Sequence, residues 1–226
     1  MEFINIAIDG PAGAGKSTIS KTVASEMGYA YIDTGAMFRA VALYAIRCGK
    51  NTEVGDEIAP LLPDIDIDIK AGENGNIIIL NGEDVTGKIR TPEVSMGASN
   101  VGKIPEVRQK LLELQRKIAK SGNVVMDGRD IGTHVLPDAQ VKIFLTASPQ
   151  IRARRRLSEL MEKGETVTFD EVLSDMIKRD ENDSKRAIAP LMQAADAILV
   201  DTTHLTLPQS IAKVLDTVKE KAGEIL

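Results

Sequence analysis

Apolar and polar residues recur along this chain with two periods, one typical of buried strands and one typical of one-sided helices. Short apolar runs that suit buried parallel strands lie at residues 3–8, 29–32, 124–126, 141–145 and 197–200. Between them, apolar residues return at helical spacing, as at Val107, Leu111, Leu114 and Ile118 in a helix that Pro105 opens. This alternation predicts an α/β fold in three layers, a five-stranded parallel sheet flanked by helices.

A different period interrupts this order between residues 63 and 88. Ile65, Ile67 and Ile69 alternate with charged residues, which is typical of a half-exposed strand. Asn74-Gly75 and Asn81-Gly82 are signals for tight hairpin turns. We therefore expect residues 63–88 to form a small antiparallel β subdomain inserted into the parallel fold.

An arginine-rich segment follows the fourth predicted strand. The helix that begins at Ser148-Pro149 carries Arg152, Arg154, Arg155 and Arg156, and its apolar stripe leaves Arg152, Arg155 and Arg156 on the more exposed side. Guanidinium groups stay charged, and they offer a planar fork of N–H donors to phosphate oxygens. We expect residues 149–164 to form a lid that closes over phosphate groups.

The next helix begins with a capping box formed by Thr168 and Glu171. If this helix continues, Arg179, Asp183 and Arg186 lie on one of its faces.

Residues 10–18 carry the strongest chemical signal. The stretch Gly10-Pro11-Ala12-Gly13-Ala14-Gly15-Lys16-Ser17 matches the phosphate-loop pattern G-x-x-x-x-G-K-[ST] at every fixed position, and Thr18 follows it. It lies between a predicted strand and a predicted helix, as a phosphate loop requires. Backbone N–H groups of the glycine-rich turn and the helix N-terminus bind phosphate oxygens, and Lys16 adds a point charge. We expect a nucleoside triphosphate here, with the Ser17 hydroxyl offered to Mg²⁺.

Polar residues follow the predicted strands at their carboxyl ends, where open α/β sheets bind ligands. They are Asp33, Thr34, Asp127, Arg129 and Asp130. Asp127 ends an apolar strand, which favours a role in orienting Mg²⁺ beside the phosphate loop. Phosphoryl transfer needs positive charge on the donor, the acceptor and the transferred group, and this chain has enough arginines for two phosphate-bearing substrates. A simple nucleotide-binding switch does not require them.

Composition narrows the class of partners. The 226 residues carry a net charge of −5, few aromatic side chains and no Trp, which argues against nucleic acid and membranes as general partners. No apolar run approaches the length of a membrane span and the first residues lack the features of a signal peptide, so we expect a cytoplasmic protein. The single cysteine, Cys48, cannot form an internal disulfide, and its place on an apolar stripe with Met37, Val41 and Tyr44 predicts a buried thiol.

Several stretches together resemble the bacterial cytidylate kinase family. In order along nearly the whole chain they are IDGPAGAGKST, YIDTGAMFRAVAL, GEDVTGKIRTPEV, MDGRDIGT, VKIFLTAS, the arginine-rich segment and KRDENDSKRAIAPL. The resemblance implies a nucleoside monophosphate kinase that uses ATP and Mg²⁺ to phosphorylate CMP or dCMP, and we expect a monomer. The chain has Thr34 where the family also has Ser, and Ser17 where some members have Gly; the second departure puts in doubt how much Ser17 matters to the metal.

The resemblance also implies roles for individual residues. Those implied to hold the acceptor 5′-phosphate are Thr34, Arg39 and Arg129. Those implied to contact the cytosine edge are Ser99, Arg108 and Asp130. Those implied to reach the pentose are Arg179 and Asp183, with Arg186 near the phosphates. Catalytic roles are expected for Lys16, Arg129, Arg155 and Arg186, and donor binding also for Arg154 and Arg156.

The expected organisation is a single kinase domain with three parts. The core comprises residues 1–33, 104–148 and 165–226, the acceptor-binding region with its insert spans 34–103, and the lid spans 149–164.

Three alternatives remain open at this point. A kinase for another acceptor, such as adenylate, guanylate or shikimate, is disfavoured by the insert and by the set Ser99, Arg108 and Asp130. A regulatory GTP-binding switch is disfavoured because the N-K-x-D motif is absent and the D-x-x-G match at residues 84–87 lies in the insert. A nucleotide-binding scaffold without turnover predicts that replacing Arg39 or Arg129 with Ala leaves activity unaffected, because there is none.

Overall fold

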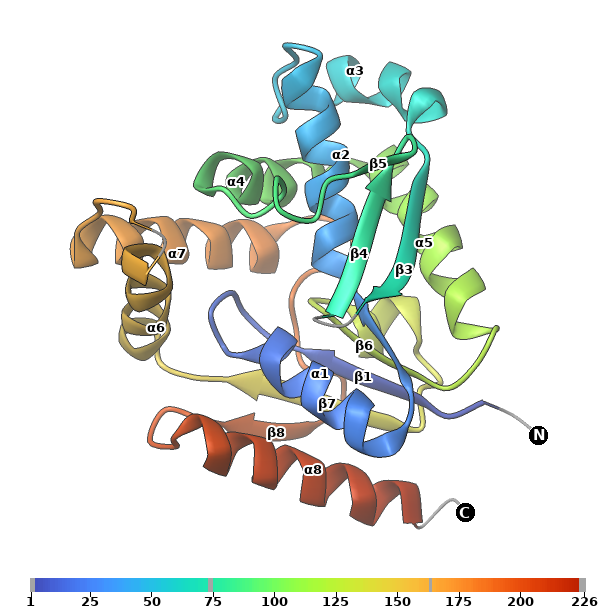
Figure 1. Ribbon diagram of the computed structural model, residues 1–226, viewed down its shortest axis with the longest axis vertical. Coiled ribbons are helices and arrows are strands. Elements are labelled where there is room, and N and C mark those ends of the chain that lie inside the picture. Colours follow the sequence, from blue (N-terminus) through green and yellow to red (C-terminus); the bar gives the residue numbers. More distant parts are fainter. Residues whose placement is uncertain (1–2, 73–74, 163, 224–226) are drawn as a thin grey trace.

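A parallel sheet of five strands in the order β2-β6-β1-β7-β8 forms the centre of the molecule (Figure 1). The structure is a computed structural model that describes residues 3–72, 75–162 and 164–223. The strands are β1 (Asn5–Asp9), β2 (Ala30–Asp33), β6 (Val124–Gly128), β7 (Val141–Thr146) and β8 (Ile198–Asp201). All neighbouring pairs are parallel, so the predicted parallel sheet is confirmed.

Helices cover both faces of this sheet and give the predicted three layers. One face packs against α1 (Lys16–Met27) and α8 (Leu207–Gly223), and the other packs against α2 (Thr34–Arg47) and α5 (Pro105–Ala119). The alternation of β1 explains this arrangement, because Ile6 and Ile8 join the α1/α8 cluster while Ala7 joins the α2/α5 cluster. The sheet is therefore buried on both sides, as its unbroken apolar strands require.

The predicted insert is present as a second, antiparallel sheet in the order β3-β4-β5. Its strands are β3 (Ile67–Gly72), β4 (Gly75–Leu80) and β5 (Glu83–Asp84), preceded by the short helix α3 (Gly55–Ile58) and a 3₁₀ helix, η1 (Ala59–Asp64). Asn81 (φ 50°) and Gly82 (φ 82°) both lie in the left-handed region, as a type I′ turn requires. Of the other predicted turn, Asn74 lies outside the described residues.

The insert has no separate core of its own. Ile67, Ile78 and Leu80 are buried in the same cluster as Met37 and Val41 of α2. In Figure 1 the meander lies alongside α2. The insert is thus an extension of the α2 side of the molecule.

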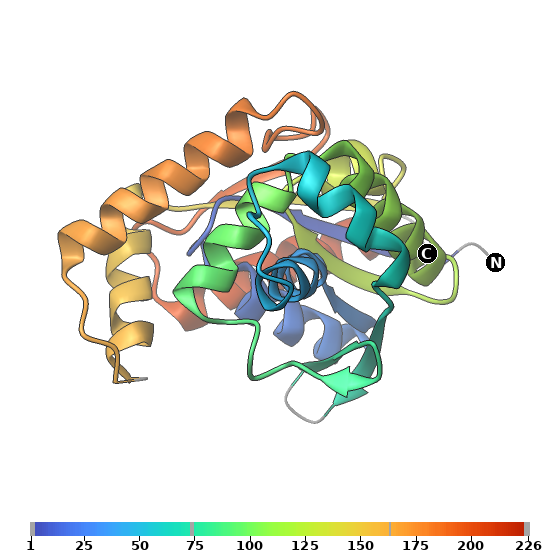
Figure 2. The ribbon, with the colours of Figure 1, turned by 90° about the horizontal axis from the view of Figure 1, so that it is seen from above.

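The arginine-rich segment forms α6 (Pro149–Glu162), which pairs with α7 (Phe169–Lys185). Ala153, Leu160, Val172 and Met176 form a small apolar cluster between them, separate from the clusters around the sheet. Figures 1 and 2 show the two helices at one side of the sheet, with α7 extending toward α4 (Pro92–Val101). The capping box at Thr168 is confirmed.

Three predictions about this fold are wrong. Helix α7 ends at Lys185, so Arg186 is not on its face but follows it in extended conformation. Cys48 is exposed because α2 ends at Arg47 and the chain then runs beyond the packed part of the helix. Arg152 is buried rather than exposed, because its face of α6 is turned toward the phosphate loop.

Within the described part of the chain, no helix combines the length and the apolar character that crossing a bilayer needs.

Candidate active site

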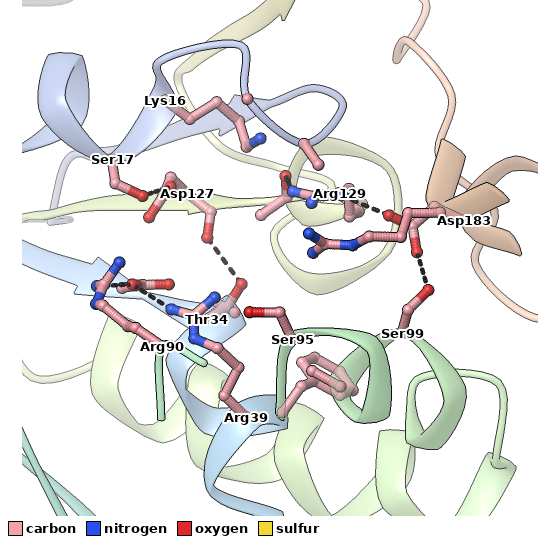
Figure 3. Close-up of a pocket in the computed structure, with 18 of the residues that line it drawn as sticks. Lys16, Ser17, Thr34, Arg39, Arg90, Ser95, Ser99, Asp127, Arg129 and Asp183 are labelled. Atoms are coloured by element: carbon pink, nitrogen blue, oxygen red, sulfur yellow. Dashed lines mark hydrogen bonds and ion pairs between the residues drawn. The ribbon is translucent and has the colours of Figure 1, made fainter. Parts of the chain in front are cut away.

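The carboxyl ends of β1, β2 and β6 meet at one edge of the sheet. Asp9 is in register with Gly128, and Asp33 is in register with Asp127. The loops that follow these strands therefore open into one cavity of about 460 Å³. Figure 3 shows that Lys16 and Ser17 approach this cavity from one side and Arg39 and Arg90 from the other.

The phosphate loop connects β1 to α1 and forms one end of the cavity. Only glycine fits at residue 10, because a Cβ there would lie 1.9 Å from the Leu145 carbonyl oxygen. Lys16 donates from Nζ to the Pro11 carbonyl oxygen at 2.7 Å. Burial, with the nearby Arg129, lowers the pKa of Lys16. An anion beside this amine reverses that shift by favouring the charged form, so the loop is suited to phosphate.

Ser17 and Asp127 lie together beside the loop. Ser17 Oγ donates to one carboxylate oxygen of Asp127 at 3.1 Å, and the Tyr31 hydroxyl donates to the other at 3.0 Å. Burial and the nearby Asp33 raise the pKa of Asp127 to about 6. Among the described residues no group of three His, Cys, Asp or Glu side chains is placed to hold a metal. Two hard oxygen donors next to a phosphate site fit Mg²⁺, which takes few protein ligands and completes its shell with phosphates and water.

The opposite end of the cavity is built by the start of α2 and by α4. Thr34 Oγ1 donates to the Asp127 carbonyl oxygen at 2.7 Å, which fixes this hydroxyl at the end of β6. Arg39 pairs with Asp33 at 2.8 Å, and Arg90 pairs with the same carboxylate at 2.9 Å. Ser95 of α4 points into the cavity near them (Figure 3).

Between the two ends, α7 brings an acid and an arginine to the cavity. Arg129 Nε donates to Asp183 at 2.8 Å, and Ser99 Oγ donates to the other oxygen of that carboxylate at 3.3 Å. Burial and the nearby Arg129 lower the pKa of Arg179 to about 10. The Arg179 Nε is buried and has no hydrogen-bond partner within the described structure. Crowded cations with an unused donor favour an anionic ligand at this point.

Asp130 connects two further arginines behind Arg129. It accepts hydrogen bonds from Arg108 of α5 and from Arg186, the second at 3.1 Å. Asp130 and Arg186 line the cavity, whereas Arg108 does not, and the Arg108 guanidinium lies 5.6 Å from the ring centre of Phe38, which does. Arg108 therefore influences the cavity indirectly, through its hydrogen bond to Asp130 and its contact with the ring of Phe38.

The arginines of α6 are distributed over three environments. Arg156 lines the cavity. Arg154 is exposed and outside it, and Arg155 donates to the Thr202 carbonyl oxygen at 2.9 Å. Of the three predicted lid arginines, the structure brings Arg156 to the site.

Arg152 is the fourth arginine of this segment, and it is 3% exposed. It donates to the carbonyl oxygens of Ala12 at 3.0 Å and Ala147 at 2.8 Å, and pairs with Asp180 of α7 at 2.7 Å. It thus joins the phosphate loop to α6 and α7.

Sequence reasoning missed three functional candidates at this site, Asp9, Arg90 and Ser95, and it placed Arg152 in the lid segment but on the wrong side of its helix. Asp9 accepts from the N–H groups of Ile131 and Gly132 at 2.8 and 2.7 Å and so holds the turn after Arg129 and Asp130. Its position directly before the phosphate loop was a signal for this role, but Arg90 and Ser95 follow the insert and show no periodicity that marks them.

Known proteins are similar to this chain in sequence and in fold. A family model described as cytidylate kinase matches residues 6–220. The chain is 53% identical over 96% of its length to a cytidylate kinase of Caldicellulosiruptor bescii, of which the match also covers 96%. It is 52% identical to the cytidylate kinase of Carboxydothermus hydrogenoformans, over 96% of this chain and 98% of that protein. A solved structure of an uncharacterized protein from Eubacterium ventriosum, 14% identical, superposes with a TM-score of 0.50 over 98% of both chains and shares the fold. The chain belongs to the cytidylate kinase family.

Proposed function

We propose that this protein transfers the γ-phosphoryl group of ATP to CMP or dCMP, giving ADP and CDP or dCDP. The observation that carries the proposal is the cationic cavity with two ends, one formed by a phosphate loop and the other by arginines and hydroxyls of α2 and α4. Such a cavity places a donor and an acceptor phosphate in line, which is what phosphoryl transfer requires of a protein.

At the donor end, the loop amides and Lys16 bind the β- and γ-phosphates of ATP. Gly10, Pro11, Ala12, Gly13, Ala14, Gly15, Ser17 and Thr18 complete this loop. Lys16 leaves the Pro11 carbonyl oxygen and turns to the phosphates, where the new anion favours its charged form. Ser17 and Asp127 hold Mg²⁺, which, when bound, neutralises developing charge on the phosphate oxygens.

At the acceptor end, Thr34, Arg39 and Arg129 bind the 5′-phosphate. Asp130 and Ser99, with Arg108 behind them, contact the cytosine edge, and Arg179 and Asp183 reach the pentose. No side chain needs to act as a base, because the acceptor phosphate is already largely dianionic near neutral pH.

The lid closes over the transferring group. Arg156 and Arg186 already line the cavity, and Arg154 and Arg155 join the phosphates as α6 moves. The small apolar cluster shared by α6 and α7 supports a moving unit that includes part of α7 in addition to residues 149–164. A monomeric state and a cytoplasmic location stay predictions of the sequence.

The experiment that tests the function is ADP formation from Mg·ATP with CMP, dCMP, UMP, AMP, GMP and shikimate as separate acceptors. Turnover confined to CMP and dCMP, or much faster with them, is expected. Faster turnover with another acceptor contradicts the cytosine assignment, and ATP hydrolysis without any acceptor contradicts the kinase. Arg129→Ala is expected to lower kcat/KM by at least a hundredfold, or about 3 kcal/mol, because it removes a cation between the two phosphates.

A further inference from the structure

The carboxylate of Asp127 is held at both of its oxygens. Tyr31 donates from its hydroxyl to Oδ1 at 3.0 Å, and Ser17 donates to Oδ2 at 3.1 Å. Asp127 is 3% exposed, and Figure 3 shows its side chain next to that of Ser17. Turning this carboxylate therefore breaks a buried hydrogen bond, which is costly where no water can replace the donor.

The position of Tyr31 follows from the pairing of β2 with β6. Tyr31 is in register with Val125, and Asp127 lies two residues farther along β6 and on the same face. Tyr31 and Val125 both pack in the apolar cluster of α1 and α8. A tyrosine combines an apolar ring with a polar end, so the ring fills the cluster while the hydroxyl meets the carboxylate.

Two neighbours hold Tyr31 in place from outside the sheet. The Nζ of Lys21 in α1 lies 5.9 Å from the centre of its ring, and Asn76 of β4 donates to its carbonyl oxygen at 2.7 Å. Tyr31 is not one of the described residues that line the cavity, whereas Ser17 and Asp127 are. Any effect of the Tyr31 hydroxyl on a ligand is therefore exerted through Asp127.

Mg²⁺ and Ca²⁺ make different demands on such a carboxylate. Mg²⁺ takes few protein oxygens in octahedral geometry and retains water, whereas Ca²⁺ accepts more ligands and often both oxygens of one carboxylate. Asp127 cannot turn both oxygens toward one ion without losing its hydrogen bond from Tyr31. The arrangement in this protein therefore fits the smaller ion.

We propose that Tyr31 is a positioning residue that fixes the Asp127 carboxylate beside Ser17, and that it thereby favours Mg²⁺ over Ca²⁺ with the donor phosphates. The inference rests on the proposed function, because it takes the ion to bind together with ATP. It gives Tyr31 a part in the choice of ion and no part in binding either nucleotide directly.

Binding of a non-hydrolysable ATP analogue, measured by calorimetry, separates the ion from the nucleotide. The Kd is measured with excess Mg²⁺, with excess Ca²⁺ and with EDTA, and the EDTA value divided by each metal value gives the gain in affinity from that ion. Tyr31→Phe removes the hydroxyl and keeps the ring in its cluster. It is expected to lower the Mg²⁺ gain about tenfold, the effect of one hydrogen bond to a charged group, and to leave the Kd in EDTA within about twofold.

The Ca²⁺ gain of the same variant is expected to stay the same or to rise, because the freed carboxylate can offer both oxygens. Equal losses for Mg²⁺ and Ca²⁺ overturn the proposed choice of ion. An unchanged Mg²⁺ gain, or a wild-type protein in which Mg²⁺ brings no gain, overturns the role of Tyr31. Failure of the wild-type protein to phosphorylate CMP instead contradicts the proposed function, and it is seen before any variant is made.

The matched control is Tyr29→Phe. Tyr29 packs against the same apolar cluster as Tyr31, and its hydroxyl has no hydrogen bond within the described residues. Tyr29→Phe therefore removes a hydroxyl from this cluster without touching Asp127. It is expected to keep the wild-type gains for both ions, and a loss of Mg²⁺ gain equal to that of Tyr31→Phe attributes the effect to packing and overturns the proposal.

Asp127→Asn tests whether Tyr31 acts through the carboxylate. In this background Tyr31→Phe is expected to change the remaining Mg²⁺ gain by less than about twofold, because the charged acceptor of its hydrogen bond is absent. A further loss of about tenfold in the double variant shows that Tyr31 acts by another route and overturns the proposal.

Discussion

Gly128, at the end of β6, shows how tightly single residues are fitted at the site. A Cβ at this position would lie 2.6 Å from Ile131 Cδ1 and 2.7 Å from Thr34 Oγ1. The neighbours that must yield are the hydroxyl proposed to bind the acceptor and a side chain of the turn that follows Asp130. The absence of a side chain at residue 128 therefore sets the position of Thr34.

Gly128→Ala is expected to raise KM for CMP several-fold and to lower the free energy of unfolding by about 1–3 kcal/mol, because overpacking displaces Thr34. Steady-state kinetics and denaturant unfolding measure the two effects. Gly122→Ala is the control, since a Cβ there meets nothing within 4 Å. Wild-type behaviour of Gly128→Ala contradicts the proposed importance of the Thr34 position.

Asp9 gives a prediction about pH. Burial raises its pKa from 3.8 to about 6, so the folded state binds this proton more tightly than the unfolded chain. The contribution of Asp9 to stability is then fully present below pH about 4 and declines as the pH rises to about 6.

Denaturant unfolding of the wild type and of Asp9→Asn between pH 4 and pH 7 measures this contribution, because Asn does not titrate. The wild-type free energy of unfolding minus that of the variant is expected to fall with rising pH, by on the order of 3 kcal/mol. A difference that is constant over this range shows that Asp9 ionises at its ordinary pKa.

At the scale of elements, α6 is anchored through one buried side chain, Arg152. Arg152 is buried between the phosphate loop, the end of β7 and α7, and its removal leaves Asp180 and the Ala12 carbonyl oxygen without this donor. The element that carries the lid arginines is therefore anchored to the loop that holds the donor phosphates.

Arg152→Met is expected to lower the free energy of unfolding by about 3 kcal/mol and to raise KM for ATP more than KM for CMP, because a buried ion pair loses one partner at the donor end. Thermal melting and kinetics check this. Lys185→Gln is the control, because its pair with Glu181 is long, at 3.7 Å, and exposed. Equal effects of Arg152→Met on both KM values contradict the assigned anchoring role.

Elements of this protein were predictable from sequence where local pattern decides, and not where a distant neighbour decides. The apolar runs, the capping box at Thr168 and the Asn81-Gly82 turn depend on residues close in sequence, so strands, helices and the insert were predicted correctly. The burial of Arg152 depends on the Ala12 carbonyl oxygen, 140 residues away, and helical spacing alone placed it on the exposed side. Cys48 was predicted as buried because its stripe was extended one turn too far.

The site followed the same division. The phosphate loop is contiguous in sequence. Asp127 was expected near it because it ends a predicted strand of the same sheet, and Ser17 Oγ lies 3.1 Å from its carboxylate. Arg90 and Asn76 reach Asp33 only because the insert folds back over β2. No local pattern contains that information.

At the scale of the whole molecule, the cavity lies where three parts of the chain meet. The phosphate loop and the sheet provide Lys16 and Asp127, α2 and the segment after the insert provide Arg39 and Arg90, and α6 and α7 provide Arg156 and Arg179. Closing this cavity around two substrates requires α6 to approach the α2 side.

The single cysteine offers a way to measure this movement. Cys48 is exposed at the end of α2, and Ser158→Cys places a second thiol on the exposed side of α6. With spin labels at both sites, the distance is expected to shorten when CMP and a non-hydrolysable ATP analogue bind together, and to change less with either alone. An unchanged distance with both ligands contradicts lid closure. Labelled protein with Cys48 alone controls for intermolecular pairs.

The shared core of the insert and α2 bears on how such a segment is inherited. Ile67, Ile78 and Leu80 are buried in one cluster with Met37 and Val41 of α2. Residues 63–88 therefore cannot simply be transferred to a shorter kinase. The helix of that kinase that corresponds to α2 would have a polar, solvent-exposed face where this insert needs an apolar one.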